Sequence, residues 1–98
     1  MNIQAMMKQA QKMQKDMMNT KKEIDGMEFT GKSSFVTVKL NGAKEVISVK
    51  IDSETIEKDE IELLEDMILV ATNDALKQID RTTEEKMGKY TQGMPGLF

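Results

Sequence analysis

Four lysines in the first 22 residues are spaced so that a helix would carry them away from its apolar side. Lys8, Lys15 and Lys22 recur every seven residues, and Lys12 falls between the first two. At a rise of about 1.5 Å per residue, lysines seven apart stand roughly 10 Å from one another along a helix axis. An ammonium group attracts phosphate as a point charge and reads base edges poorly. The spacing therefore predicts phosphate contact without sequence discrimination, although an ordinary solvated helix face has the same composition.

The same segment carries a narrow apolar seam opposite the lysines. Alternating spacings of three and four are typical of a coiled coil, in which one side of the helix stays turned toward a partner. The eight seam positions, seven of them apolar, are Ile3, Met6, Ala10, Met13, Met17, Thr20, Ile24 and Met27. Methionine suits both ordinary core filling and an exchangeable protein contact. A helix of this kind can bind a protein surface with one side and an anionic lattice with the other.

Charge is distributed unevenly along the chain, whose formal net charge is −3. Residues 1–22 carry five lysines and one acid, a local charge of +4, whereas residues 52–66 carry eight acids and one lysine, a local charge of −7. Nucleic-acid-binding domains are often basic overall, so the net charge alone argues against such a partner. The asymmetry instead predicts an electrostatically polar molecule that approaches a polyanion with its N-terminal part.

The residues that usually carry out catalysis are missing. The chain has no histidine and no cysteine, which excludes the usual triads, thiolate metal sites and disulfides. Asp52, Asp59, Asp66 and Lys50 form no recognised catalytic spacing, and no phosphate-binding glycine loop is present. The acidic run also lacks the ligand spacing of a calcium loop. We therefore expect no enzyme activity, no metal site and no cofactor.

A second group of cations lies near the C-terminal end of the chain. Lys77 and Arg81 are four residues apart and would share one face of a helix. Lys86 and Lys89 follow them. Cations in this position interact favourably with the negative end of a helix dipole, and a second DNA-contacting patch is the alternative interpretation.

Ninety-eight residues suffice for one domain, and so short a chain buries only a modest core when it folds alone. We expect a single domain over residues 1–98, with a flexible tail at about 88–98 that contains Gly93, Pro95 and Gly96. No apolar run approaches 18 residues, and the N-terminus lacks a signal-peptide pattern. We therefore expect a cytoplasmic protein without membrane contact.

Three strands are expected to follow the first helix, which the sequence places at 3–24 with a left-handed cap near Gly26. The strand segments are 28–31, 35–40 and 45–51. In the second, Val36, Val38 and Leu40 alternate with polar residues, as in a half-buried strand. Asn41-Gly42 predicts a tight hairpin turn with positive φ.

A second long helix is expected after the strands. Asp59, with Glu62 three residues later, has the pattern of a capping box, and Gly88 is the expected end. More apolar residues lie on this helix than one small sheet can cover, which predicts a second contact. The expected apolar stripe consists of Ile61, Leu63, Leu64, Met67, Ile68, Val70, Ala71, Ala75 and Ile79. The whole chain therefore reads as an α+β domain of the order α-β-β-β-α.

Several strings along the chain together resemble the YbaB/EbfC family of nucleoid-associated proteins. They are MMKQAQKMQKDM at 6–17, FVTVKLNG at 35–42, VKID at 49–52, LLEDMILVATNDALKQI at 63–79 and GMPG at 93–96. The resemblance implies a bacterial homodimer joined through its sheets, with helices projecting like the arms of tweezers. It also implies binding of duplex DNA with loose sequence preference through the helical arms. The residues that the resemblance implies as DNA contacts in this sequence are Lys8, Lys12, Lys15, Lys22, Lys77 and Arg81.

Two functions are consistent with this reading. The first is an architectural or gene-regulatory protein of the bacterial nucleoid, in which a twofold dimer neutralises phosphates along duplex DNA. The alternative is a dimeric adaptor that binds a protein in recombination or replication through its methionine-rich seam, with little direct DNA binding. Salt distinguishes the two, because phosphate binding weakens steeply with ionic strength and an apolar seam hardly responds.

Overall fold

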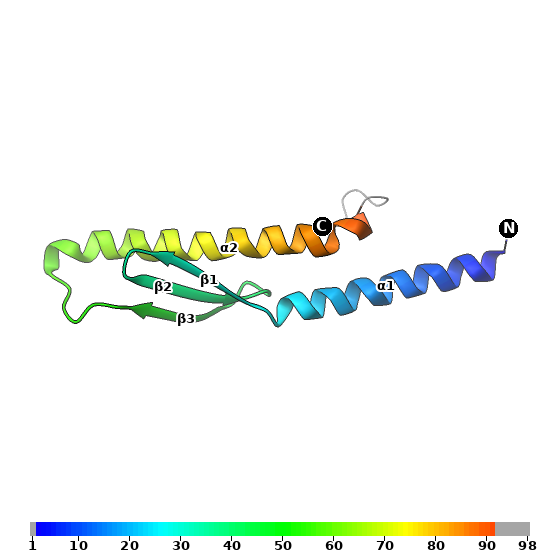
Figure 1. Cartoon of the computed structure of the whole chain (residues 1–98), viewed down its shortest axis with the longest axis horizontal. Coiled ribbons are helices and arrows are strands. Elements are labelled where there is room, and N and C mark those ends of the chain that lie inside the picture. Colours follow the sequence, from blue (N-terminus) through cyan, green and yellow to red (C-terminus); the bar gives the residue numbers. More distant parts are fainter. Residues whose placement is uncertain (1, 92–98) are drawn as a thin grey trace.

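The chain folds as a helix, a three-stranded antiparallel sheet and a second long helix, which confirms the expected α+β class. We analysed a computed structural model that describes residues 2–91. The elements are α1 (Ile3–Asp25), β1 (Glu28–Ser33), β2 (Val36–Asn41), β3 (Val46–Ile51), η1 (Lys58–Glu60, a 3₁₀ turn) and α2 (Ile61–Thr91). Figure 1 shows α2 as one layer, with the sheet and α1 following one another in a second layer beneath it. The result is an elongated molecule of 71 × 21 × 14 Å.

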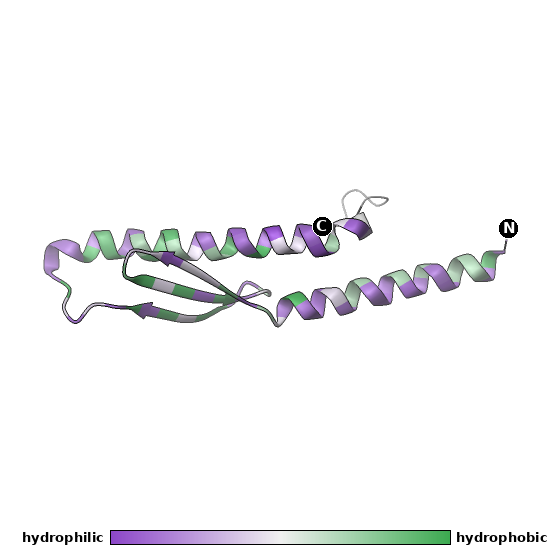
Figure 2. Cartoon of the chain, in the orientation of Figure 1, coloured by the Kyte–Doolittle hydropathy of each residue, from purple (hydrophilic) through white to green (hydrophobic). Residues whose placement is uncertain are grey.

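The core lies between α2 and the face of the sheet that is turned toward it. β2 is the middle strand, and Val36, Val38 and Leu40 point from it toward α2, each no more than 1% exposed. α2 meets them with Ala71 and Ala75, which are fully buried. Figure 2 shows the alternation of apolar and polar residues along the strands. The expected burial pattern of the second strand is therefore confirmed.

The contact between α2 and β1 is so close that it requires a residue without a side chain. A Cβ atom on Gly31 would overlap the carbonyl oxygen of Ala71 and lie 2.8 Å from the amide nitrogen of Ala75. The two alanines make the complementary contribution, because their short side chains let the helix axis approach the strand. α2 is therefore held directly over β1 and β2.

β3 has apolar residues on the same face of the sheet, but α2 does not cover them. Val49 pairs with Val38 and Ile51 pairs with Val36, which places these side chains on the helix side. Val49 is nevertheless 48% exposed, whereas Val38 is fully buried. The exposed apolar residues of this strand, which we call the β3 apolar face, are Val46, Ile47, Val49 and Ile51.

The two edges of the sheet differ in whether side chains of α2 form hydrogen bonds with their backbone. At the β1 edge, Gln78 donates from Nε2 to the carbonyl oxygen of Thr30 at 2.8 Å, and the Lys32 amide donates to Oδ2 of Asp74 at 3.4 Å. Side chains of α2 therefore satisfy backbone groups that would otherwise be open to another strand. Among the described residues, no such bond reaches β3 from α2.

The C-terminal half of α1 packs against the end of α2. Ile24, Met87 and Tyr90 are buried together, and Met13 and Met17 pack against them from the seam of α1. This half of the seam therefore finds its partner within the same chain. The N-terminal half of α1 extends beyond this contact, and Ile3 at its tip is 70% exposed.

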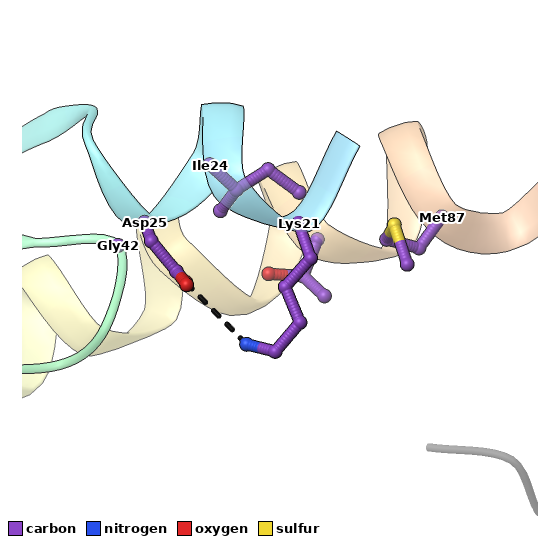
Figure 3. Close-up of a pocket in the computed structure, with 6 residues that line it drawn as sticks. Lys21, Ile24, Asp25, Gly42 and Met87 are labelled. Atoms are coloured by element: carbon purple, nitrogen blue, oxygen red, sulfur yellow. Dashed lines mark hydrogen bonds and ion pairs between the residues drawn. The ribbon is translucent and has the colours of Figure 1, made fainter. Parts of the chain in front are cut away.

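Two glycines occupy turns without the positive φ that the sequence predicts. Gly26 follows α1 in the right-handed region, with φ −87°. In the β2–β3 hairpin the residue with positive φ is Lys44, at 66°, and its amide donates to the carbonyl oxygen of Asn41. Gly42 is needed for a different reason, since a Cβ there would overlap the carbonyl oxygen of Ile24. Figure 3 shows the hairpin at Gly42 against the end of α1.

The start of α2 also differs from the expected one. The Asp59–Glu62 capping box is wrong: the backbone amide of Glu57 donates to Oε1 of Glu60 at 3.3 Å, two residues earlier. The turn η1 therefore precedes the helix. Ile61, expected on the buried face, is 49% exposed because packing against the core begins only at Leu64. Two further residues of the expected stripe, Leu63 and Val70, are also exposed.

α2 continues through Gly88 to Thr91, so the predicted end at Gly88 is wrong. Met87 and Tyr90 lie on either side of this glycine and are buried against α1. Their burial outweighs the cost of about 1 kcal/mol for glycine inside a helix. Positions 88–91 of the expected flexible tail are thus helical, and the rest of that tail lies outside the described residues.

Replacing Gly31 by alanine should lower the free energy of unfolding by about 3 kcal/mol, because the methyl group would push α2 off β1. Urea denaturation followed by circular dichroism measures this change. Gly88→Ala is a matched control, since nothing lies within 4 Å of its Cβ position. The control should raise stability by up to about 1 kcal/mol. Equal stability of Gly31→Ala and wild type would contradict the close contact.

Amide hydrogen exchange should divide α1 into two parts. A helical segment of about ten residues without tertiary contacts is marginally stable, so residues 3–12 should exchange far faster than residues 17–25. Met87→Ala should extend the fast-exchanging part toward Ile24, because it removes the side chain on which α1 rests. Uniform protection along α1 in the wild type would show that its N-terminal half has a partner.

Candidate nucleic-acid interface

The lysines predicted on one side of α1 are placed there by the structure. The seam faces α2 through Met17 and Ile24, and at 100° per residue Lys15 and Lys22 point in nearly the opposite direction. Lys8 continues the same row toward the N-terminus, while Lys12 lies to one side of it. All four side chains belong to exposed residues.

None of these four lysines forms an ion pair with a carboxylate within residues 2–91. Their neighbour Lys21 differs, since its Nζ lies 3.4 Å from Oδ1 of Asp25 in the same helix. Unpaired ammonium groups are free to exchange their counterions for phosphate oxygens. The basic side of α1 is therefore chemically available for a polyanion.

The N-terminal end of α1 adds to this positive potential. Asn2 caps the helix, with its Oδ1 accepting from the amides of Gln4 and Ala5 at 3.0 and 3.4 Å. The first turn contains no acidic residue. The helix dipole and the first of the lysines thus act in the same direction along the projecting half of α1.

The second group of predicted cations lies on α2 and does not form one surface with the lysines of α1. Lys86 Nζ lies 3.0 Å from Oε1 of Glu23, and Lys89 Nζ lies 5.0 Å from the ring centroid of Tyr90. Lys77 and Arg81 are exposed on α2, and Lys77 borders an open hollow beside β1. Lys86 and Lys89 thus have contacts within the chain, and only Lys77 and Arg81 remain comparable with the lysines of α1.

Two residues that position α1, Tyr90 and Glu23, were not singled out from the sequence. Tyr90 Oη and Thr20 Oγ1 lie 3.5 Å apart and share a hydrogen bond. The carboxylate of Glu23 accepts a hydrogen bond from the ammonium group of Lys86. Together with the buried apolar contacts they fix the direction in which α1 leaves the core. The continuation of apolar positions beyond Ile79, at Met87 and Tyr90, was the sequence signal for this contact.

The structure offers no enclosed site for a small molecule at this junction. The cavity in Figure 3, between the end of α1, the β2–β3 hairpin and α2, has a volume of about 70 Å³. Pockets for cofactors and substrates are several times larger. Within residues 2–91 no group of three acidic side chains is arranged to hold a metal ion, and no helix has the length and apolarity to cross a membrane.

Comparisons with known proteins identify the family of this chain. A nucleoid-associated protein of Lactococcus lactis subsp. cremoris is 46% identical over 97 residues, which cover 97% of this chain and 98% of that protein. A nucleoid-associated protein of Oceanobacillus iheyensis is 50% identical over 101 residues, covering 99% and 97%. Residues 1–94 match the sequence profile described as the YbaB/EbfC DNA-binding family. The chain therefore belongs to the YbaB/EbfC DNA-binding family.

Proposed function

We propose that this protein binds duplex DNA largely without regard to sequence, through the phosphates, and that it has an architectural or gene-regulatory role in the bacterial nucleoid. The observation that carries the proposal is the row of lysines on the exposed side of α1, which form no ion pair within residues 2–91. The relatives are named nucleoid-associated proteins, which supports the proposal. The nucleoid of the cytoplasm is accordingly the proposed location.

The binding mode follows from the chemistry of the row. Lys8, Lys15 and Lys22 are separated by roughly 10 Å along a straight helix, so α1 laid along a groove edge meets several phosphates. Each ammonium sits on a flexible stem and contacts a phosphate without defining which base lies beside it. Affinity then comes from the release of counterions, and the dependence of the affinity on salt concentration gives the number of phosphates that are neutralised. Lys77 and Arg81 are proposed as secondary contacts.

We also propose that the protein acts as a homodimer joined through β3. The β3 apolar face is open, and the outer edge of β3 has no cap from α2, in contrast to the β1 edge. An exposed apolar strand at an open edge favours pairing with another chain. A second copy of the chain, related by a twofold axis, would cover the β3 apolar face and pair with the open edge of β3, using the same residues in both copies. Each dimer then presents two arms and is able to bridge or bend DNA.

A protein-binding adaptor remains the second candidate because of the apolar residues on the projecting half of α1. Ile3, Met6 and Met7 are each more than half exposed, and α2 contributes Leu63 and Leu69 elsewhere. Such residues fit a protein partner, for example one in recombination or replication. Binding that persists at high ionic strength favours this candidate over phosphate contact.

The α1 proposal predicts the outcome of changing Lys8, Lys12 and Lys15 together to glutamine. Affinity for random-sequence duplex DNA at low salt should fall at least about tenfold, and the slope of log K against log salt should flatten by up to about 2.7, or 0.9 per lost contact. Fluorescence anisotropy at three salt concentrations measures both quantities.

The matched control for that variant is Lys44, Lys58 and Lys89 changed to glutamine, which removes the same charge from other elements. It should bind nearly as the wild type does. Two unrelated DNA sequences should lose affinity by the same factor in the α1 variant. An unchanged slope would remove α1 from the interface, and a loss confined to one sequence would indicate base recognition instead.

The dimer proposal predicts that Val49→Asp produces monomers, because it buries an unpaired carboxylate in the joint between two copies. Light scattering should give twice the 11.1 kDa chain mass for the wild type and a single chain mass for the variant. Ser48→Asp is the control, because Ser48 is next to Val49 in the chain but pairs with Lys39 and lies on the other face of the sheet. A dimeric Val49→Asp protein would exclude this face as the joint.

A further inference from the structure

The face of the sheet that is turned away from α2, which we call the open face, carries three lysines in adjacent cross-strand rows. Lys32 pairs with Thr37, and Thr37 pairs with Lys50, so two lysines flank a threonine in one row. In the next row Lys39 lies between Thr30 and Ser48. The cross-strand neighbours of each lysine are therefore hydroxyl side chains.

The side chains of these three lysines form no ion pair within residues 2–91. Lys32, Lys39 and Lys50 are all exposed. Acids lie in the row next to α1, where Glu28 pairs with Asn41 and Glu45 Oε1 accepts from Asn41 Nδ2 at 2.9 Å. An ordinary solvated sheet face mixes both signs of charge and gains from opposite-charge pairs across strands. This face is uniformly cationic in its two central rows.

The open face and the basic side of α1 point in the same direction. The sheet and α1 form one layer beneath α2 (Figure 1), and each turns its apolar side toward α2. The lysines of both elements are therefore on the side of the molecule away from α2. Carboxylates such as those of Glu62 and Asp66 lie instead on the exposed side of α2. Charge is thus separated across the two layers of the fold, as well as along the sequence.

We propose that the open face of the sheet is a second contact for the phosphate backbone of duplex DNA, through Lys32, Lys39 and Lys50. This inference extends the proposed function, in which α1 supplies the first contact. With strands about 4.8 Å apart, Lys32 and Lys50 stand roughly 10 Å from each other across β2. Lys39 lies about two residues, or 6.6 Å, further along the strands. Three ammonium groups at these spacings reach phosphates on both sides of a groove about 12 Å wide.

The hydroxyl groups between the lysines contribute to the same contact. Thr37 and Ser48 are donors of the kind that bind phosphate oxygens in protein–DNA interfaces. Glu28 separates this surface from the lysines of α1, so DNA makes two contacts with a gap between them. In a dimer joined through β3, the open faces of the two sheets lie side by side and double the surface.

The test uses Lys32, Lys39 and Lys50 changed together to glutamine in the full-length chain. Affinity for random-sequence duplex DNA should fall about 10- to 100-fold at low salt, and the salt slope should flatten by up to about 2.7. The variant with Lys44, Lys58 and Lys89 changed to glutamine is again the matched control. Circular dichroism melting and light scattering confirm that fold and assembly are kept, since exposed lysines on strands contribute little to stability.

A second measurement locates the DNA directly and does not depend on charge removal. Because the chain contains no cysteine, Ser48→Cys introduces a single thiol on the open face that accepts an aryl-azide photocrosslinker. Asn73→Cys places the same probe on the exposed side of α2. Crosslinking to duplex DNA should be strong from position 48 and weak from position 73. Equal crosslinking from both positions would overturn the proposal.

The failure of this inference can be told apart from failure of the proposed function. If the wild type binds DNA and the α1 variant loses affinity, but the sheet variant keeps the wild-type affinity and salt slope, only the sheet contact is wrong. If the wild type itself does not bind duplex DNA at low salt, both proposals fall. If the sheet variant loses more affinity than the α1 variant, the open face is the main contact.

Discussion

The arrangement of the molecule depends on the close approach of α2 to β1 at Gly31. A helix that rests on a glycine and two alanines sits nearer to the strand than ordinary side chains permit, and this fixes its lateral position over β1 and β2. β3 is then left outside the cover of α2, with apolar residues exposed at an open edge. The same contact turns the other face of the sheet to solvent. The proposed dimer joint and the proposed sheet contact with DNA both follow from where α2 is held.

The direction of α1 depends on a smaller set of contacts. Ile24, Met87 and Tyr90 form a separate buried cluster, and the Lys86–Glu23 ion pair lies at its margin. An exposed ion pair contributes at most about 1 kcal/mol, so the apolar cluster determines the orientation. Because the cluster contacts only the C-terminal half of α1, the N-terminal half projects beyond the core without packing against it. The proposed DNA contact on α1 is therefore fixed at the base of the helix and adaptable at its tip.

Much of this could be predicted from the sequence because periodicity is a local property. The row at Lys8, Lys15 and Lys22 and the alternation around Val38 depend only on helix and strand geometry. The end of α2 at Gly88 was predicted wrongly, since glycine propensity is local whereas the burial of Tyr90 against α1 is not. Gly42 was assigned to the hairpin for its φ, yet its role is the approach to Ile24. Both the end of α2 and the role of Gly42 depend on contacts with α1, a segment distant in sequence, which local patterns do not reveal.

The net charge of −3 does not oppose DNA binding in a molecule built this way. At physiological salt the Debye length is about 8 Å, so a phosphate responds to the charges near it and hardly to those across the molecule. Within residues 2–91, α1 and the sheet carry lysines without ion-pair partners on one side, whereas acids such as Glu62 and Asp66 lie on the exposed side of α2. In the proposed complex those acids favour one orientation on the duplex, because turning the α2 layer toward the phosphates is repulsive. In the proposed complex, an acidic protein with this distribution of charge approaches DNA with its α1 and sheet layer first.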